Sequence, residues 1–128
     1  MVRILYIAAG GAIGAVLRYW VSGVSLRFLP AVFPYGTMVV NLAGSFLIGL
    51  LWGVSEAVLI AQNIRLMIFI GVLGSFTTFS TFSLESFNLV RDGEYVYFAL
   101  NIILSVLLGL ILVFAGYFLS RHVVQMIR

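Results

Sequence analysis

The chain contains no cysteine and no lysine, and it has only one histidine and four acidic residues among its 128 residues. Without cysteine there is no disulfide, no thiolate metal site and no cysteine nucleophile. The single histidine, His122, stands near the C-terminal end without the serine, acidic or metal-ligand neighbours that an enzyme site would need. The seven basic residues are arginines spread singly along the chain, so they form no basic face for nucleic acid.

Charged residues make up only 9% of the chain, whereas hydrophobic residues make up 63% and the mean hydropathy is +1.21. A soluble domain typically carries about 25% charged residues. A chain of this length could not bury so many apolar side chains in one core. The composition therefore predicts an integral membrane protein with a single transmembrane domain over residues 1–128.

Four stretches are long and apolar enough to be membrane spans, since a helix that crosses ~30 Å of hydrocarbon needs about 20 mostly apolar residues. They are residues 4–23, 36–55, 65–90 and 95–120. Pro30 and Pro34 precede the second stretch and are expected to keep its start non-helical. We therefore expect an all-α membrane protein with four transmembrane helices and both ends on the same side.

The third stretch is unusual because half of the chain's serine and threonine residues lie in it, within residues 75–86. Polar groups inside an apolar span are costly in hydrocarbon, so they usually face a cavity, a partner helix or a permeant solute. Gly74 and the Ser and Thr residues after it also weaken the helix. We expect an interruption over residues 74–78 that gives two half-helices. The alternative is a continuous helix whose hydroxyls bond back to its own carbonyls.

Polar and small residues four positions apart form stripes on the second and fourth spans. The stripes are Thr37, Asn41, Ser45, Gly49 and Gly53 in the second span, and Asn101, Ser105 and Gly109 in the fourth. Small residues at this spacing most often let helices pack closely. Phenylalanines at helical spacing, such as Phe79 and Phe82, are also most often packing residues.

The polar groups in the spans are mostly neutral donors: amide N–H, hydroxyl O–H and the edges of aromatic rings. Arg18 stands toward the end of the first span, and Glu85 is the only acidic residue well inside a span. Such a set suits a small, strongly hydrated anion, because neutral donors can replace its water in steps without trapping it. A cation pathway would usually show several central carboxylates.

Four helices of this length cannot comfortably enclose a pore, so we expect at least a homodimer with the third helix near its axis. The distribution of arginines, which would set the orientation of the chain in the membrane, has little bias. Arg3, Arg65, Arg121 and Arg128 stand on the side of the termini, and Arg18, Arg27 and Arg91 stand on the other. So small a bias allows insertion in both orientations, and a single orientation set by the C-terminal arginines is the alternative.

Three segments resemble the motifs of the Fluc (CrcB) family of fluoride channels, in the family's order and over nearly the whole chain. They are residues 10–19, 36–44 and 74–85, the last reading GSFTTFSTFSLE. The resemblance implies an antiparallel, dual-topology homodimer with two fluoride pores. It also implies passive, selective fluoride efflux from the cytoplasm through the inner membrane of a microbe. The chain departs from the pattern at Asn101, where some relatives carry tyrosine, and at Ser75, where glycine is frequent.

The resemblance also assigns roles to individual residues. It implies a structural Na+ at the dimer centre, held by the backbone carbonyls of Gly74 and Thr77 from each subunit. Arg18 would lie near a vestibule. The residues placed along the fluoride path are Asn41 as a donor, Phe79 and Phe82 as a box of ring edges, Ser80, Thr81, Ser83 and Ser105 as hydroxyls, and Glu85 toward the end of the track.

Two other functions remain as alternatives. A small multidrug-type, proton-coupled antiporter would need an acidic residue within the membrane, but the first span has none and Glu85 lies late in the third. A non-transporting assembly subunit would use its polar stripes for packing alone and would conduct nothing.

Overall fold

A computed structural model of the chain describes residues 1–28 and 32–127, and these residues form helices and short connections only. Pro30, Arg128 and the side chain of Arg27 lie outside the described part, while Pro34 stands directly before the second helix. In chain order the helices are α1 (Val2–Phe28), α2 (Tyr35–Ala57), α3 (Gln62–Leu66), η1 (Met67–Leu73), α4 (Gly74–Phe76), α5 (Phe79–Arg91) and α6 (Tyr95–Ile127).

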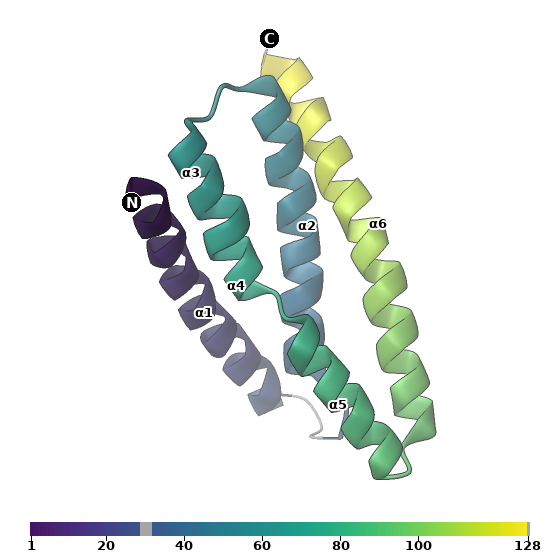
Figure 1. Ribbon diagram of the computed structural model, residues 1–128. Coiled ribbons are helices and arrows are strands. Elements are labelled where there is room, and N and C mark those ends of the chain that lie inside the picture. Colours follow the sequence, from purple (N-terminus) through teal and green to yellow (C-terminus); the bar gives the residue numbers. More distant parts are fainter. Residues whose placement is uncertain (29–31, 128) are drawn as a thin grey trace.

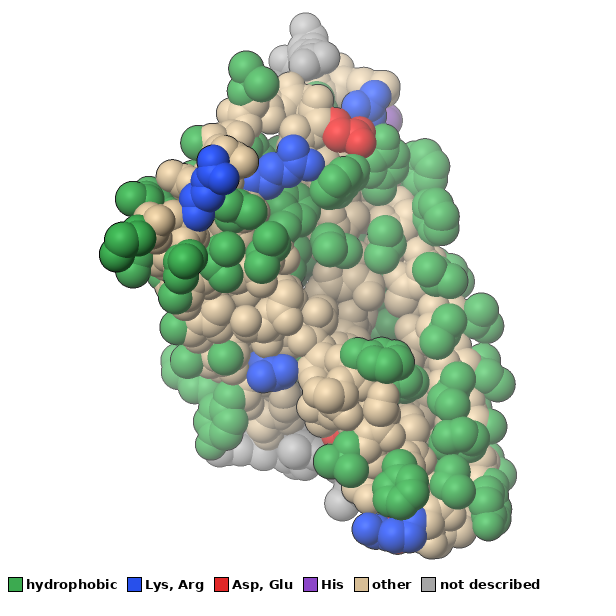
Figure 2. All heavy atoms as spheres, in the orientation of Figure 1, with side chains coloured by type: hydrophobic (Ala, Val, Ile, Leu, Met, Phe, Trp, Pro, Cys, Tyr) green, Lys and Arg blue, Asp and Glu red, His purple; other side chains and the backbone are tan. Residues whose placement is uncertain are grey.

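Four helical stretches are long and apolar enough to cross a membrane, which confirms the predicted number of long apolar helices. They are Val2–Val24, Tyr35–Ala57, Gln62–Arg91 and Tyr95–Met126. The third combines α3, η1, α4 and α5. On the face shown in Figure 2, most charged side chains lie near the two ends of the molecule and hydrophobic side chains lie between them, as expected of a membrane-spanning surface.

The helices α2 and α6 form the main pair and lie side by side (Figure 1). In contrast, α1 packs against η1 and α4, and α5 packs against the N-terminal half of α6. The first turns of α1 and the last turns of α6 lie at one end, and the turn between α5 and α6 lies at the other (Figure 1). Gly93 in that turn has φ of +80°, a left-handed conformation that glycine adopts without strain.

Glycines make the closest contacts between these helices. Gly49 of α2 lies against the carbonyl oxygen of Val113, and Gly116 of α6 lies against that of Phe46, so that a Cβ atom at either glycine would overlap a carbonyl group. The close packing predicted from the glycine stripe of α2 is confirmed, because only a residue without a side chain lets these two backbones approach so closely.

One added methyl group at these contacts should separate α2 from α6. Gly49→Ala and Gly116→Ala each place a Cβ against a backbone carbonyl that cannot move aside, so each variant should lose about 1–2 kcal/mol of stability. Thermal unfolding in detergent, followed by circular dichroism, measures the loss. Gly23→Ala is the control, because nothing lies within 4 Å of a Cβ at that position. Equal losses in all three variants would contradict this account of the packing.

The first half of the third span is wider than an α-helix. Residues Met67–Leu73 form η1, a π-helix, in which each N–H bonds to the carbonyl five residues earlier. Gly71 of η1 lies directly against Gly10 of α1. The wide turns therefore meet α1 through a contact between backbones, and no residue pattern in this segment predicts the widening.

Candidate functional site

The third span is interrupted at Thr77 and Thr78. Thr77 has φ −78° and ψ 156°, and Thr78 has φ −150° and ψ 115°, so both are extended between α4 and α5. The interruption predicted over residues 74–78 is therefore present but shorter, because Gly74 keeps helical dihedral angles. The alternative of a continuous third helix is wrong. Figure 1 shows the irregular link between α4 and α5 halfway along the span.

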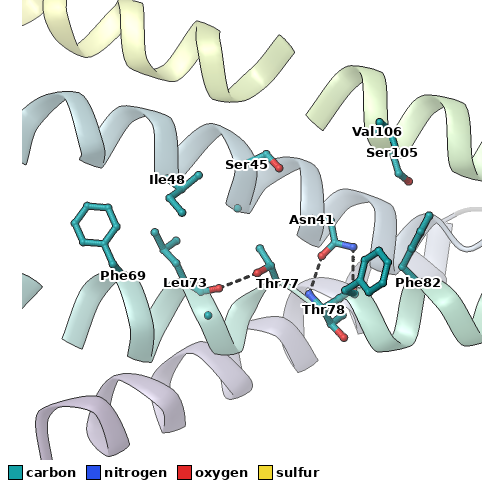
Figure 3. A pocket seen from close by; sticks show the side chains of 13 residues that line it. Asn41, Ser45, Ile48, Phe69, Leu73, Thr77, Thr78, Phe82, Ser105 and Val106 are labelled. Carbon is teal, nitrogen blue, oxygen red and sulfur yellow. Dashed lines mark hydrogen bonds between the residues drawn. The ribbon is translucent and has the colours of Figure 1, made fainter. Parts of the chain in front are cut away.

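Asn41 of α2 binds both backbone groups of Thr78 (Figure 3). Its Nδ2 donates to the Thr78 carbonyl oxygen (3.1 Å), and its Oδ1 accepts from the Thr78 N–H (2.8 Å). A backbone group without a partner is costly at membrane depth, where no bulk water can satisfy it. The Asn41 carboxamide therefore stabilises the extended backbone of the break.

Thr78 in turn caps the N-terminus of α5. Its Oγ1 accepts from the Thr81 N–H (3.3 Å) and lies 2.9 Å from Thr81 Oγ1 and 3.4 Å from Ser80 Oγ. Threonine is one of the favoured residues at this position, because its oxygen satisfies a free N–H of the first turn. The hydroxyls of Ser80 and Thr81, both predicted along the ion path, thus gather around the cap.

An open pocket of about 390 Å³ lies beside the break (Figure 3). Residues from α2, η1, α4, α5 and α6 line it together with Thr77 and Thr78. Six residues predicted at the site are among them: Asn41, Gly74, Thr77, Phe79, Phe82 and Ser105. The others are Gly44, Ser45, Ile48, Phe69, Leu73, Thr78 and Val106. The fold thus brings together residues from three of the four spans.

Phe79 and Phe82 are neighbouring rings in this lining. Their centroids lie 5.7 Å apart, and their planes make an angle of 39°. Phe79 is 79% exposed in the single chain, whereas Phe82 is half-buried. The edge of an aromatic ring carries partial positive charge, so two such rings beside polar donors can face an anion.

The pocket is mostly apolar, and the polar groups in its lining are uncharged. Among the described residues that line it there is no arginine, aspartate or glutamate, and its polar side chains are one carboxamide and several hydroxyls. Within residues 1–28 and 32–127, no group of three or more His, Asp or Glu side chains could hold a metal ion. A cation here would have only neutral oxygen atoms as ligands, those of backbone carbonyls, hydroxyls or the carboxamide.

The other predicted path residues do not line this pocket. Ser83 Oγ donates to the Phe79 carbonyl oxygen (2.9 Å), and Arg18 lies half-buried on α1. Glu85 Oε1 accepts from Thr37 Oγ1 (2.8 Å), while its Oε2 is buried and has no hydrogen-bond partner in the described part of the chain. Buried polar atoms normally have a partner, so Oε2 is available to one more donor.

A buried hydrogen-bond chain connects α5 to α6, and sequence reasoning underestimated it. Asn101 is 1% exposed, and its Nδ2 donates to Ser86 Oγ (3.0 Å), which donates to the Phe82 carbonyl oxygen (2.8 Å). Ser105 Oγ lies 3.5 Å from Asn101 Oδ1. The spacing of Asn101 and Ser105 indicated a shared face, but no signal indicated Ser86 as the partner.

Comparison with known proteins shows the family to which the chain belongs. The profile of the family "CrcB-like protein, Camphor Resistance (CrcB)" matches residues 5–117. The chain is 43% identical to the fluoride-specific ion channel FluC of Parabacteroides distasonis over 128 residues, the full length of both. It is 47% identical to FluC of Shewanella amazonensis over 116 residues (91% of this chain, 94% of the relative) and 45% identical to FluC of Geobacter metallireducens over 123 residues (95% and 99%). The resemblance found in three motifs is confirmed, and the chain belongs to the CrcB family, the family of the FluC fluoride channels.

Proposed function

We propose that this protein is a fluoride-selective channel that lets fluoride leave the bacterial cytoplasm passively across the inner membrane. The observation that carries the proposal is the pocket at the break, which lies near the middle of the third span and combines neutral donors with two phenylalanine rings and no charged side chain. The full-length relatives named fluoride-specific ion channels support the same function.

Fluoride is small and strongly hydrated, so a path across the membrane must supply groups that replace its water. In the pocket, the Asn41 carboxamide and the hydroxyls of Ser45 and Ser105 can donate, and the edges of Phe79 and Phe82 can face the ion. Neutral donors release an anion more readily than an arginine would. The membrane potential then drives the anion outward with about 2.3 kcal/mol per 100 mV, without any coupled reaction.

We assign the remaining predicted residues to the continuation of this path. The hydroxyls of Ser80, Thr81 and Ser83 lie on the first turns of α5, next to the pocket wall. Glu85, held by Thr37, lies further along α5 and marks the end of the polar track. Arg18 on α1 is assigned to a vestibule, where its charge would attract anions without trapping them in the pocket.

The channel is proposed to be an antiparallel, dual-topology homodimer. Its support is an incomplete site, because the pocket is open and both Gly74 and Phe79 are exposed in the single chain, although they lie near the middle of a span. Polar backbone at that depth is tolerated only where protein covers it or where it lines a cavity. A second copy placed across a two-fold axis would cover it with the same surface.

A structural Na+ is proposed at the centre of this dimer, held by the carbonyl oxygens of Gly74 and Thr77 from each subunit. The backbone fits such an ion. Gly74 lies in the last helical turn before the break, where carbonyl oxygens lack helical partners, and Thr77 is extended, so its carbonyl does not follow the helical hydrogen-bond pattern. Broken transmembrane helices elsewhere bind Na+ through carbonyls freed in this way. When bound, the ion supplies a fixed positive charge near the anion path.

Ion flux from liposomes tests the proposed function. Purified protein in liposomes loaded with potassium fluoride should release fluoride rapidly once valinomycin lets potassium follow, and it should release almost no chloride under the same conditions. Ion-selective electrodes record both. Equal release of chloride would contradict selectivity. No release of either ion would favour a non-transporting subunit, and proton-coupled uptake of a cationic drug would favour an antiporter; either result overturns the channel.

A further inference from the structure

The break in the third span diverts two particular backbone donors. In an unbroken α-helix, the Thr78 N–H would bond to the Gly74 carbonyl and the Thr81 N–H to the Thr77 carbonyl. Here the Thr78 N–H donates to Asn41 Oδ1 (2.8 Å), and the Thr81 N–H donates to Thr78 Oγ1 (3.3 Å). The carbonyls of Gly74 and Thr77, the two proposed above as cation ligands, are therefore among those that lose their helical partners at the break.

Asn41 is placed to keep this arrangement fixed. It projects from the regular helix α2, where the preceding residue, Val40, is fully buried. Its second bond, from Nδ2 to the Thr78 carbonyl oxygen (3.1 Å), holds Thr78 from both sides. Thr78 cannot return to a helical conformation without breaking both bonds. A carboxamide has two N–H groups, so one N–H of Asn41 is left for the pocket that it lines.

We infer that Asn41 and the Thr78 hydroxyl are positioning residues for the cation site: by taking up the N–H groups of Thr78 and Thr81, they keep the carbonyl oxygens of Gly74 and Thr77 free to bind the ion. The inference rests on the Na+ site of the proposed function. It gives Asn41 two tasks, since one N–H is left for the anion pocket and its other polar atoms hold the cation ligands in place.

Sodium-dependent thermal unfolding of the full chain in detergent, without any flux, tests the inference. Protein purified in N-methylglucamine is titrated with NaCl, with choline chloride as the salt control. Asn41→Leu and Thr78→Val should each raise the NaCl concentration at half-maximal stabilisation at least about tenfold, the size expected when a residue that orients metal ligands is lost. A purely structural role would lower the unfolding temperature without moving this midpoint.

Conservative variants separate the two tasks of Asn41. Asn41→Asp loses the donor to the Thr78 carbonyl oxygen but keeps an acceptor for the Thr78 N–H. Because the inference depends on this N–H, the sodium midpoint should not rise, whereas fluoride efflux should fall because a carboxylate repels the anion. Thr78→Ser keeps the capping hydroxyl and should retain the wild-type midpoint.

Unchanged sodium midpoints in Asn41→Leu and Thr78→Val would overturn the inference. If Asn41→Leu does not fold, the comparison of the sodium midpoints of Thr78→Val and Thr78→Ser tests the inference instead. Absence of any sodium dependence in the wild type would overturn both the inference and the Na+ site. The channel itself is tested separately, by the efflux assay.

Discussion

Phe79→Ile and Phe82→Ile should each slow fluoride efflux from liposomes roughly a hundredfold, which corresponds to a barrier higher by about 2.7 kcal/mol. Isoleucine keeps an apolar side chain at the pocket but lacks the positive ring edge that can face an anion. The two rings lie 5.7 Å apart in the same lining. Losing either one leaves a gap in the series of groups that replace water. A fluoride electrode measures the rate on equal amounts of reconstituted protein.

Phe87→Ile is the matched control for the two ring variants. Phe87 lies on the same helix, α5, is 61% exposed and does not line the pocket. Its variant should conduct like the wild type. Wild-type efflux in the Phe79 and Phe82 variants, or equal slowing in all three, would show that the pocket rings have no special part in conduction.

The number of long helices could be predicted because bilayer thickness fixes the length of an apolar span. The helix ends could not be predicted in the same way. The predicted membrane spans end at about residues 23 and 120, whereas the helices that contain them, α1 and α6, continue to Phe28 and Ile127. Hydropathy reports which residues sit in hydrocarbon, but the backbone hydrogen bonds of a helix continue into the polar residues beyond it.

Residue chemistry indicated only that the polar groups in the spans face a cavity, a partner helix or a solute, and it was the resemblance that named residues of a shared cavity. Asn41, Phe79, Phe82 and Ser105 do share one. The partners of these groups could not be predicted. The resemblance gave Asn41 the role of a donor, and the structure adds that one of its N–H groups and its oxygen bind the backbone of Thr78. Which residue on another helix lies opposite depends on the register between helices, and periodicity alone does not fix that register.

Glu85 and the π-helix are two further features that the sequence pattern did not predict. Thr37 and Glu85 are 48 residues apart in sequence, and only the packing of α2 against α5 brings their side chains within 2.8 Å. The π-helix η1 lies in close contact with α1 at Gly10 and Gly71. The first feature arises from a tertiary contact and the second lies at one, and no local pattern in either segment indicated them.

Asn101→Leu should destabilise the protein by about 2 kcal/mol, because it removes the amide that donates to the buried Ser86 hydroxyl and accepts from the half-buried Ser105 hydroxyl. Leucine shares the branching of asparagine at Cγ but is the larger side chain, so the loss includes overpacking as well as the lost hydrogen bonds. Because Ser86 also donates to the Phe82 carbonyl oxygen, the position of the Phe82 ring depends on this chain of bonds. Fluoride efflux should therefore fall about tenfold, as expected for a barrier raised by about 1.4 kcal/mol.

Thermal unfolding in detergent and efflux from liposomes measure these two effects of Asn101→Leu separately. Asn88→Leu is the control, since Asn88 is half-buried on α5 and its side chain makes no hydrogen bond among the described residues. It should leave both measurements close to wild type. If Asn101→Leu unfolds like the wild type, the buried chain does not hold α5 to α6. If stability falls while efflux is unchanged, the chain stabilises the fold without positioning Phe82. A fall in both for Asn101 alone would show that the amide on α6 fixes the ring on α5.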